Sequence, residues 1–487
     1  MLKSLLQTES NYTLTENGAL THRSTKSYVL DLFALGGSAN NRKDVSTLIK
    51  NALYEDTRLA LKVIFYLSDI REGQGRRDFF KVSLLEILLQ DEELTIKLLP
   101  YVAEFGRWDY LYWFVDTRIQ SNALSILEKE VARCLTNKTP SLVFKWLASE
   151  DASSKETKRN AEITRRAFGL TRREYRKMLS WGRKALGDAV VERKMSTNLW
   201  EDIDHSKVSS VAMKKYRKAF ISHTPNKFTT FVGKVEKGEE KINSKVLYPH
   251  DIIHAGAHTE GVERRALAAQ WNALPNYLSE NVRALAVVDT SGSMRGRPIE
   301  IASSIGIYLA ERMVGEFKDT IISFSEEARL FDVSHGDVFD KYNFLRRNEI
   351  VENTNLKSVF NLLLNTAMKH NVPANEMPNR IIIMSDMEFD SATGRSPWSY
   401  SPRVTNLDAI RAKYTVSGYE FPQIIFWNVN ARNIQTPATM NDEGVILVSG
   451  YSPVIMKSVL SDDPYITPYR AMLEVINVER YAFIDKL

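Results

Sequence analysis

The sequence predicts a multidomain chain in which a HEAT-like array of α-helices is followed by a doubly wound α/β domain. Two observations lead to this fold class. In the first half, apolar residues recur at three- and four-residue steps, whereas from residue 283 onward short apolar runs alternate with helical segments. The chain has 487 residues, of which 44% are hydrophobic, so it can bury more than one core. We expect an N-terminal extension over 1–20, the helical domain over 21–275 and the α/β domain over 276–487.

The helical half shows its pattern most clearly in the segment DTRLALKVIFYLSDIREG, whose apolar residues lie on one helical face. Gly73 and Gly75 end this helix, and the apolar run FFKVSLLEILL follows. ELTIKLLPYVAEFG and RWDYLYWFVDTRI are interpreted as a further helix pair. Short helices joined by tight turns are typical of an α-solenoid, although the sequence contains no clean fixed-length repeat.

Positive charge is concentrated in one part of the helical half. Residues 141–220 contain 19 Lys and Arg against 10 Asp and Glu, a local net charge of +9, whereas the whole chain carries +5. A concentrated basic segment is the electrostatic pattern of a polyanion-binding protein. A solvated helical surface rich in Lys and Arg is the alternative interpretation.

The second half reads as strands that alternate with helices. ALAVVD, DTIISFS, RIIIMSD, QIIFWNVN and GVILVSG are strand-like apolar runs, and PIEIASSIGIYLAERM and SVFNLLLNTAMKH are helical. This alternation predicts right-handed crossovers and a mostly parallel sheet. Ligands of such sheets bind at the carboxyl ends of the strands.

Five oxygen-bearing side chains are predicted to meet at that edge: Asp289, Ser291, Ser293, Thr354 and Asp386. The first three follow one strand, Thr354 precedes a helix, and Asp386 ends the strand RIIIMSD. Carboxylate and hydroxyl oxygens suit hard cations, so we expect Mg²⁺, with Mn²⁺ and Ca²⁺ as alternatives. Two carboxylates leave part of the coordination to water or to an acidic group of a partner. Helix caps are the alternative role for such Ser and Asp residues.

VVDTSGSM, the ENTNL turn and IIIMSDMEFD resemble the metal-ion-dependent adhesion site of von Willebrand A domains. The resemblance implies that Asp289, Ser291 and Ser293 are the ligands of the first loop, Thr354 that of the second and Asp386 that of the third. Glu388 and Asp390 lie beyond this pattern, and we interpret them as surface acids in preference to groups that support the ligands.

The helical half resembles the TROVE module of Ro ribonucleoproteins, through LALKVIFYLSDIREGQGRRDFF, AEFGRWDYL, FKWLASE, SSVAMKKYRKAF and LYPHDII. Among TROVE-like proteins, the chain is most similar to an uncharacterised family of bacteria, phages and plants. The resemblance spans about residues 20–480 and implies a ring of helix pairs closed by the A domain. It further implies that small structured RNA binds outside the ring and single-stranded RNA ends bind in its hole.

The candidate RNA-binding residues are cations of the glycine turn and of the basic helices: Arg71, Arg76, Arg77, Lys158, Arg159, Arg165, Arg166, Arg172, Arg173, Lys214, Lys215, Arg217 and Lys218. For each one alone, a solvated surface cation is the alternative. Lys145 and Trp146 could pack or bind RNA. His205 and His250 could contact RNA, although a structural role is the more common one for such histidines.

The sequence contains no catalytic motif that we recognise: no P-loop, no H-E-x-x-H helix and no G-x-S-x-G elbow. We therefore expect a protein that is not an enzyme. The single cysteine, Cys134, excludes an internal disulfide and favours a reducing compartment. The N-terminus lacks the apolar core of a signal peptide, and no run of about 18 apolar residues occurs. A monomeric cytoplasmic protein without membrane contact is the expectation.

Two functions remain open. The first is a Ro-like RNA-binding scaffold or chaperone for small structured or defective RNA, with a metal site for a partner. The second is a metal-dependent protein-interaction or assembly scaffold that does not bind RNA.

Overall fold

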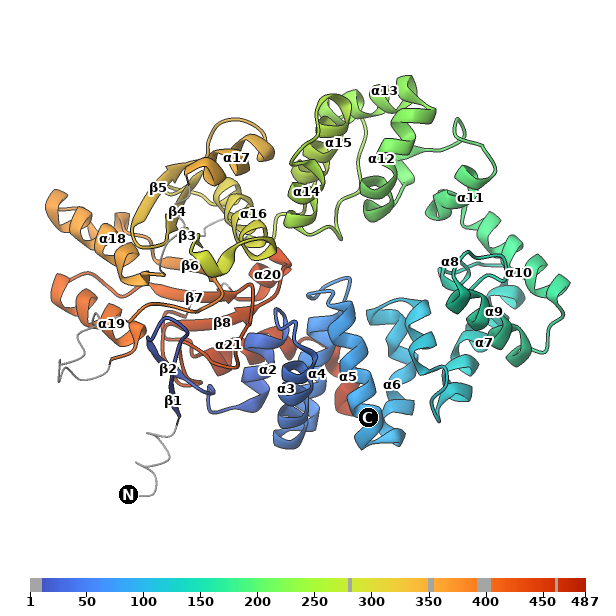
Figure 1. Cartoon of the computed structure of the whole chain (residues 1–487), viewed down its shortest axis with the longest axis horizontal. Helices are drawn as coiled ribbons and strands as arrows, with labels where there is room; N and C mark the ends of the chain where they lie inside the picture. Colours follow the sequence, from blue (N-terminus) through green and yellow to red (C-terminus); the bar gives the residue numbers. More distant parts are fainter. Residues whose placement is uncertain (1–10, 279–282, 349–353, 392–403, 460–462) are drawn as a thin grey trace.

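The computed structural model describes residues 11–278, 283–348, 354–391, 404–459 and 463–487. A helical N-terminal region is followed by an α/β domain with a six-stranded sheet, which confirms the predicted combination of helical and α/β parts. The helices curve in an arc from α2 to α15, and the arc returns to the α/β domain (Figure 1). Among the described helices, none combines the length and the apolar character needed to cross a membrane.

The first part of the arc consists of α2 (Tyr28–Gly36), α3 (Arg42–Glu55), α4 (Thr57–Ser68), α5 (Arg77–Gln90), α6 (Glu92–Phe105), η1 (Trp108–Phe114), α7 (Gln120–Asn137), α8 (Val143–Trp146), α9 (Lys155–Ala167) and α10 (Arg172–Ala185). Side-chain caps fix several helix starts. Asp56 and Asp91 accept hydrogen bonds from Leu59 N and Leu94 N, both at 2.9 Å, at the first turns of α4 and α6. Thr171 and Glu174 form a capping box on α10.

The second part of the arc consists of η2 (Gly187–Val190), α11 (Val191–Ser196), η3 (His205–Lys207), α12 (Ser210–His223), α13 (Pro225–Glu236), α14 (Pro249–Gly256) and α15 (Gly261–Asn272). Apolar residues of α11, α12 and α13 and of one side of α15 form a small separate core that includes Phe220, Phe228 and Phe231. The remaining core is continuous from the first helices into the sheet.

The segment RWDYLYWFVDTRI is not the α-helix that the sequence predicts. It forms the short 3-10 helix η1, after which Asp116 adopts a positive φ of 67°. Residues three apart align in a 3-10 helix, and this brings the rings of Tyr110 and Trp113 into a stack at 4.1 Å.

The sheet has the order β5-β4-β3-β6-β7-β8, with all neighbours parallel except β4 and β5. Its strands are β3 (Ala284–Asp289), β4 (Thr320–Phe324), β5 (Ala328–Asp332), β6 (Arg380–Ser385), β7 (Gln423–Asn428) and β8 (Val445–Ser449). The sequence did not predict β5, because this edge strand is partly exposed and lacks a continuous apolar run.

The other elements of this half of the chain are η4 (Gly292–Met294), α16 (Arg297–Arg312), α17 (Val338–Asn348), α18 (Leu356–His370), η5 (Ala374–Glu376), α19 (Asn406–Ser417), η6 (Pro453–Ile455), α20 (Met456–Val459), α21 (Pro468–Ile476) and η7 (Glu479–Lys486). Figure 1 shows α16 and α17 on one side of the sheet and α18 and α19 on the other. Helices on both faces are the layer arrangement expected for a parallel sheet.

An antiparallel hairpin precedes the helical arc, formed by β1 (Tyr12–Leu14) and β2 (Leu20–His22). Residues 1–10 of the predicted N-terminal extension lie outside the described residues. The hairpin packs on the α/β domain, with backbone bridges from Gly18 to Asp390 and from His22 to Thr436. These partners lie hundreds of residues away in sequence, so no local pattern predicts the contact.

The helical arc contacts the α/β domain at both of its ends (Figure 1). At the first end, α2 packs against β8, and Gly37 N donates to Ser449 Oγ at 2.9 Å. A Cβ at Gly37 would lie 2.4 Å from the Ser449 carbonyl oxygen, so this close approach requires glycine. At the second end, α14 packs against α16 and α17. The arc and the domain therefore form a closed frame.

Candidate functional site

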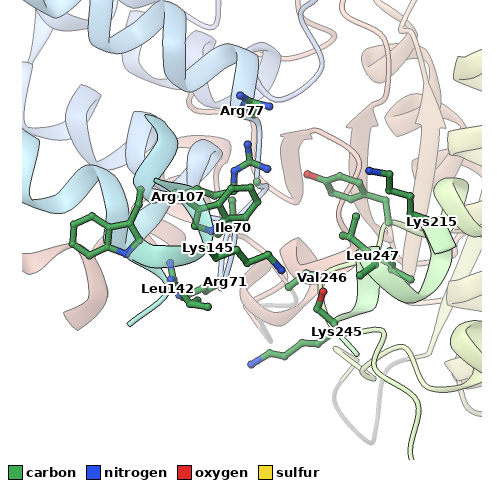
Figure 2. A pocket seen from close by; sticks show the side chains of 18 of the residues that line it. Ile70, Arg71, Arg77, Arg107, Leu142, Lys145, Lys215, Lys245, Val246 and Leu247 are labelled. Carbon is green, nitrogen blue, oxygen red and sulfur yellow. The ribbon is translucent and has the colours of Figure 1, made fainter. Parts of the chain in front are cut away.

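A cavity of about 1100 Å³ lies inside this frame. Its walls come from the turn at residues 70–77, from η1, α8, α10, α11 and α12, from residues 245–248, and from residues 452–454 of the α/β domain. Figure 2 shows Arg71, Arg77, Arg107 and Lys145 on one wall, and Lys215 and Lys245 on the wall opposite. The cavity is thus enclosed by segments that are far apart in sequence.

The cavity is strongly basic. Its only acidic lining residue in the described part of the chain is Glu192, whereas its cationic lining residues are Arg71, Arg77, Arg107, Lys145, Arg183, Arg193, Lys207, Lys215 and Lys245. A cleft lined by charges of one sign concentrates ligands of the opposite sign. The cavity therefore favours an anionic occupant.

Aromatic side chains stand among these cations. The rings that line the cavity belong to Trp108, Tyr110, Trp146, Tyr216, Tyr248 and Tyr277. The Arg107 guanidinium lies 4.0 Å from the centroid of the Trp146 ring, and Lys215 Nζ lies 4.8 Å from that of Tyr216. Cations that track a phosphate backbone and rings on which bases can stack are the two features of sites for single-stranded nucleic acid.

Several of the cavity cations form no ion pair within the described part of the chain. Arg183 donates to the carbonyl oxygens of Phe144 at 3.0 Å and Leu147 at 2.8 Å, and burial lowers its pKa. Arg183, Lys215 and Lys245 make no ion pair with any residue that the structure describes. Arg107, by contrast, is held by Asp109 at 2.6 Å.

Of the thirteen predicted RNA-binding cations, the structure places Arg71, Arg77 and Lys215 on the cavity. Arg76 instead makes contacts within the protein. It donates to the carbonyl oxygens of Gly37 and Ala39, and its guanidinium lies 4.7 Å from the ring centroid of Tyr451 in the α/β domain. The cations of α12 other than Lys215 pair with acids outside the cavity lining: Lys214 with Asp251 at 3.1 Å, and Arg217 and Lys218 with Glu263 at 2.7 and 3.9 Å.

The predicted cations of α9 and α10 do not line the cavity. Lys158 and Arg173 are exposed. The others pair with acids: Arg159 with Asp116 at 2.5 Å, Arg166 with Glu162 at 2.5 Å, and Arg165 and Arg172 with Glu150 at 3.0 and 3.8 Å. The high local charge of this segment is thus partly neutralised within it.

Sequence reasoning missed Arg107, Arg183, Arg193, Lys207 and Lys245, and it left Lys145 open between packing and binding. Each element contributes only one or two cations to the cavity, so local charge density does not reveal them. One signal was available. Arg107-Trp108, Lys145-Trp146 and Lys215-Tyr216 are adjacent cation–aromatic pairs, and all six residues line the cavity.

The two histidines considered as RNA contacts have structural environments. His205 is 3% exposed and packs against the rings of Phe220 and Phe228 at 5.0 and 5.2 Å. His250 is also buried, between the rings of Tyr248 and Tyr451. Neither lines the cavity.

A second candidate site lies at the carboxyl edge of the sheet. Asp289 ends β3 and is fully buried; its carboxylate accepts from Ser385 Oγ at 2.5 Å and from Ser291 N at 2.9 Å. Asp386 follows β6 directly, so the pairing of β3 with β6 places both carboxylates at one edge.

The three predicted hydroxyl ligands lie at the same edge. Ser291 Oγ and Ser293 Oγ are 3.2 Å apart, and Ser293 hydrogen-bonds the Asp386 side chain. Thr354 is buried; its carbonyl oxygen accepts from Asp390 N at 2.8 Å, and its Oγ1 accepts from Asn17 Nδ2 at 3.3 Å.

The electrostatics of this edge fit a cation. Burial, followed by the charge of Asp386, raises the pKa of Asp289, and burial also raises the pKa of Asp386. Asp386 Oδ2 is buried and accepts no hydrogen bond from a described residue. Both Asp289 oxygens accept hydrogen bonds, and Arg432 Nη1 lies 3.6 Å from Asp386 Oδ2; a divalent cation would add its charge and direct coordination to these contacts. The described residues contain no group of three or more His, Cys, Asp or Glu that could hold a metal. The predicted ligand set is of a different kind, because it combines two carboxylates with three hydroxyls.

Glu388 is not the surface acid that we predicted from the sequence. It is 1% exposed, and burial raises its pKa. Its carboxylate accepts from Gln435 Nε2 at 2.8 and 2.9 Å, from Asn433 Nδ2 at 2.8 Å and from Glu16 N at 2.7 Å. Glu388 therefore joins the N-terminal hairpin to the loop after β7.

Two family models match this chain, and they meet at residue 283, close to the boundary between the helical region and the α/β domain. Residues 15–87 and 124–283 match a family model described as Domain of unknown function (DUF2828). Residues 283–476 match another, Domain of unknown function (DUF7788). The chain is also similar to Uncharacterized protein L728 of Acanthamoeba polyphaga mimivirus. The two are 28% identical over an alignment of 514 positions, which covers 96% of this chain and 87% of the viral protein. Neither family description names a TROVE or von Willebrand A module, so those resemblances stay predictions.

Proposed function

We propose that this protein is a Ro-like RNA-binding scaffold or chaperone that holds single-stranded RNA in the basic cavity of its helical frame. The observation that carries the proposal is the cavity of about 1100 Å³, which is lined by cations and aromatic rings from many elements. Phosphates would contact the cations, and unpaired bases would stack on exposed ring faces.

The cavity favours single strands and RNA ends over intact helices. A-form RNA is recognised across its wide minor groove by extended surfaces. A cavity enclosed by the helical arc and the α/β domain suits a narrower occupant. Structured RNA would then contact the outer face, where the exposed Lys158 and Arg173 lie.

We further propose a von Willebrand A-type adhesion site in the α/β domain, with Asp289, Ser291, Ser293, Thr354 and Asp386 around a divalent cation. When bound, the cation would offer a coordination position to an acidic group of a partner. The buried carboxylate pair supports this part of the proposal. A metal-dependent assembly scaffold without RNA binding is the second candidate function, and it rests on this sheet edge alone.

RNA binding is tested with a fluorescein-labelled 20-nucleotide single-stranded RNA by fluorescence anisotropy between 50 and 300 mM KCl. We expect affinity to fall steeply with salt. Combined charge reversal of two exposed cavity cations, Lys215→Glu and Lys245→Glu, should weaken binding at least about tenfold. It should also reduce the salt slope by about 1.4, because each phosphate contact of a single strand contributes about 0.7.

The matched control is the double variant Lys158→Glu and Arg173→Glu, which reverses two exposed cations outside the cavity. It should leave the affinity for single-stranded RNA within about twofold. Equal loss in both double variants would assign binding to general charge and not to the cavity. No binding at 50 mM KCl would leave the assembly scaffold as the function.

A further inference from the structure

The turn of the N-terminal hairpin covers the proposed metal edge. Thr15 Oγ1 donates to the Phe389 carbonyl oxygen at 2.7 Å, and Glu16 N donates to Glu388 Oε2 at 2.7 Å. Asn17 Nδ2 donates to the Glu388 carbonyl oxygen at 2.6 Å and to Thr354 Oγ1 at 3.3 Å. The backbone of the turn is therefore fixed beside two of the proposed ligand loops.

One arginine connects the hairpin to the buried carboxylate. Arg432 Nη2 lies 2.7 Å from Glu16 Oε2, and Arg432 Nη1 lies 3.6 Å from Asp386 Oδ2. The latter oxygen accepts no hydrogen bond from a described residue. A single positive charge thus stands between a carboxylate of the hairpin and one of the proposed ligands.

A divalent cation is a stronger competitor for Asp386 than this guanidinium. It carries twice the charge, and it binds carboxylate oxygen directly. Once a cation neutralises Asp386, Arg432 would be repelled by the cation, and the Glu16 carboxylate would be the nearest acidic side chain of the hairpin.

We infer that Glu16 is an internal ligand of the metal edge, which turns from Arg432 to the bound cation and takes the position open to a partner's carboxylate. The inference rests on the proposed metal site. It makes the hairpin a built-in competitor: an acidic partner docks only when it displaces Glu16.

The exposure of these side chains permits the exchange. The side chains of Glu16 and Arg432 are 44% and 35% exposed, whereas that of Asp386 is fully buried. Glu16 lines a depression of about 450 Å³ between the hairpin and residues 433–435. A turn of the Glu16 side chain toward the cation would break its contacts with Arg432 at 2.7 Å and with Asn433 Nδ2, which donates to Glu16 Oε1 at 3.2 Å.

The test uses the full chain with Mn²⁺ alone as the probe. Electron paramagnetic resonance measures Mn²⁺ affinity, and hydrogen–deuterium exchange follows residues 12–22 with and without Mn²⁺. Glu16→Gln keeps the size of the side chain and removes its charge, and it should weaken Mn²⁺ binding about tenfold or more. Mn²⁺ should slow exchange of the hairpin in the wild type and not in Glu16→Gln.

Two further variants separate the possible failures. Asp289→Asn should abolish Mn²⁺ binding, and Glu162→Gln, which neutralises an exposed acid of α9 paired with Arg166, should leave it unchanged. Loss of binding in Asp289→Asn together with wild-type affinity and hairpin exchange in Glu16→Gln would overturn the role of Glu16 and leave the metal site standing. Absence of Mn²⁺ binding in the wild type would overturn the metal site and this inference together.

Discussion

At the scale of single residues, His250 shows how burial sets the charge of a side chain in the frame. It is 3% exposed, and burial lowers its pKa from 6.5 to about 4. Asp251 opposes this shift, whereas Arg297 and Lys214 add to it. The imidazole is therefore neutral in the folded chain at neutral pH.

His250 should make stability depend on pH. Because its folded pKa lies below its unfolded pKa, the unfolded chain takes up the proton first as pH falls. The associated stability is fully present above about pH 6.5 and is lost toward pH 4, with a maximum near 3 kcal/mol (about 1.4 kcal/mol for each unit of pKa). Urea unfolding of wild type and His250→Gln at several pH values should show the larger loss in the wild type.

The exposed His258 offers a control. His258→Gln should retain the pH dependence of the wild type. An equal acid loss in His250→Gln and the wild type would contradict the assignment to His250.

At the scale of elements, Gly256 determines how closely α14 approaches α17. A Cβ at this position would lie 2.1 and 2.3 Å from two ring carbons of the buried Phe339. Phe339 belongs to the α/β domain, so the glycine permits the contact that closes the second end of the arc.

Gly256→Ala should therefore lower the free energy of unfolding by about 1–3 kcal/mol, the usual cost of overpacking. Gly233→Ala in α13 is the matched helical substitution, because a Cβ there meets nothing within 4 Å. It should be neutral or stabilise by up to about 1 kcal/mol, because alanine favours the helix over glycine. Urea denaturation distinguishes the two, and equal effects would contradict the role of the Phe339 contact.

At the scale of the whole molecule, the C-terminal segment holds the α/β domain to the helices. The side chain of Asp69 is fully buried and accepts from Arg480 Nη2 at 2.9 Å, and the Arg480 guanidinium lies 4.6 Å from the ring centroid of Phe105. Phe483 stacks on Tyr101 with ring centroids 3.9 Å apart. Both contacts join the last residues of the chain to the α4–α6 region.

Arg480→Ala should destabilise the chain by about 3–5 kcal/mol, because it leaves the buried Asp69 carboxylate without its cationic partner, with Arg71 N and the Tyr481 hydroxyl as its remaining donors. Arg166→Ala, which removes an exposed pair with Glu162, should cost less than about 1 kcal/mol. Circular dichroism and tryptophan fluorescence should report one coincident urea transition in the wild type. A cost below about 1 kcal/mol for Arg480→Ala would show that the closure does not depend on this pair.

The sequence was sufficient for features that depend on local pattern. The buried strand ALAVVD, the polar loop after it and Asp386 after RIIIMSD all follow from short runs, so the acidic sheet edge could be predicted. The structure brings Asp289, Ser291, Ser293 and Asp386 together there.

Features that depend on distant partners could not be predicted. Thr15 and Phe389 are 374 residues apart, so the hairpin contact leaves no local trace. The cavity cations come one or two at a time from several elements, and of the dense charge of α9 and α10 only Arg183 lines the cavity. Charged residues that are close in sequence repel or pair with one another locally. Which cations face one another across the cavity depends on how the distant segments are arranged in the folded protein.

The closed frame has a topological consequence. A chain held inside the cavity is encircled by polypeptide, with the helical arc on one side and residues 452–454 of the α/β domain on the other. While both closures hold, a long polymer cannot enter sideways and must be threaded from a free end. Under the proposed function, a circular RNA could not pass through the frame, however well its bases and phosphates matched the walls.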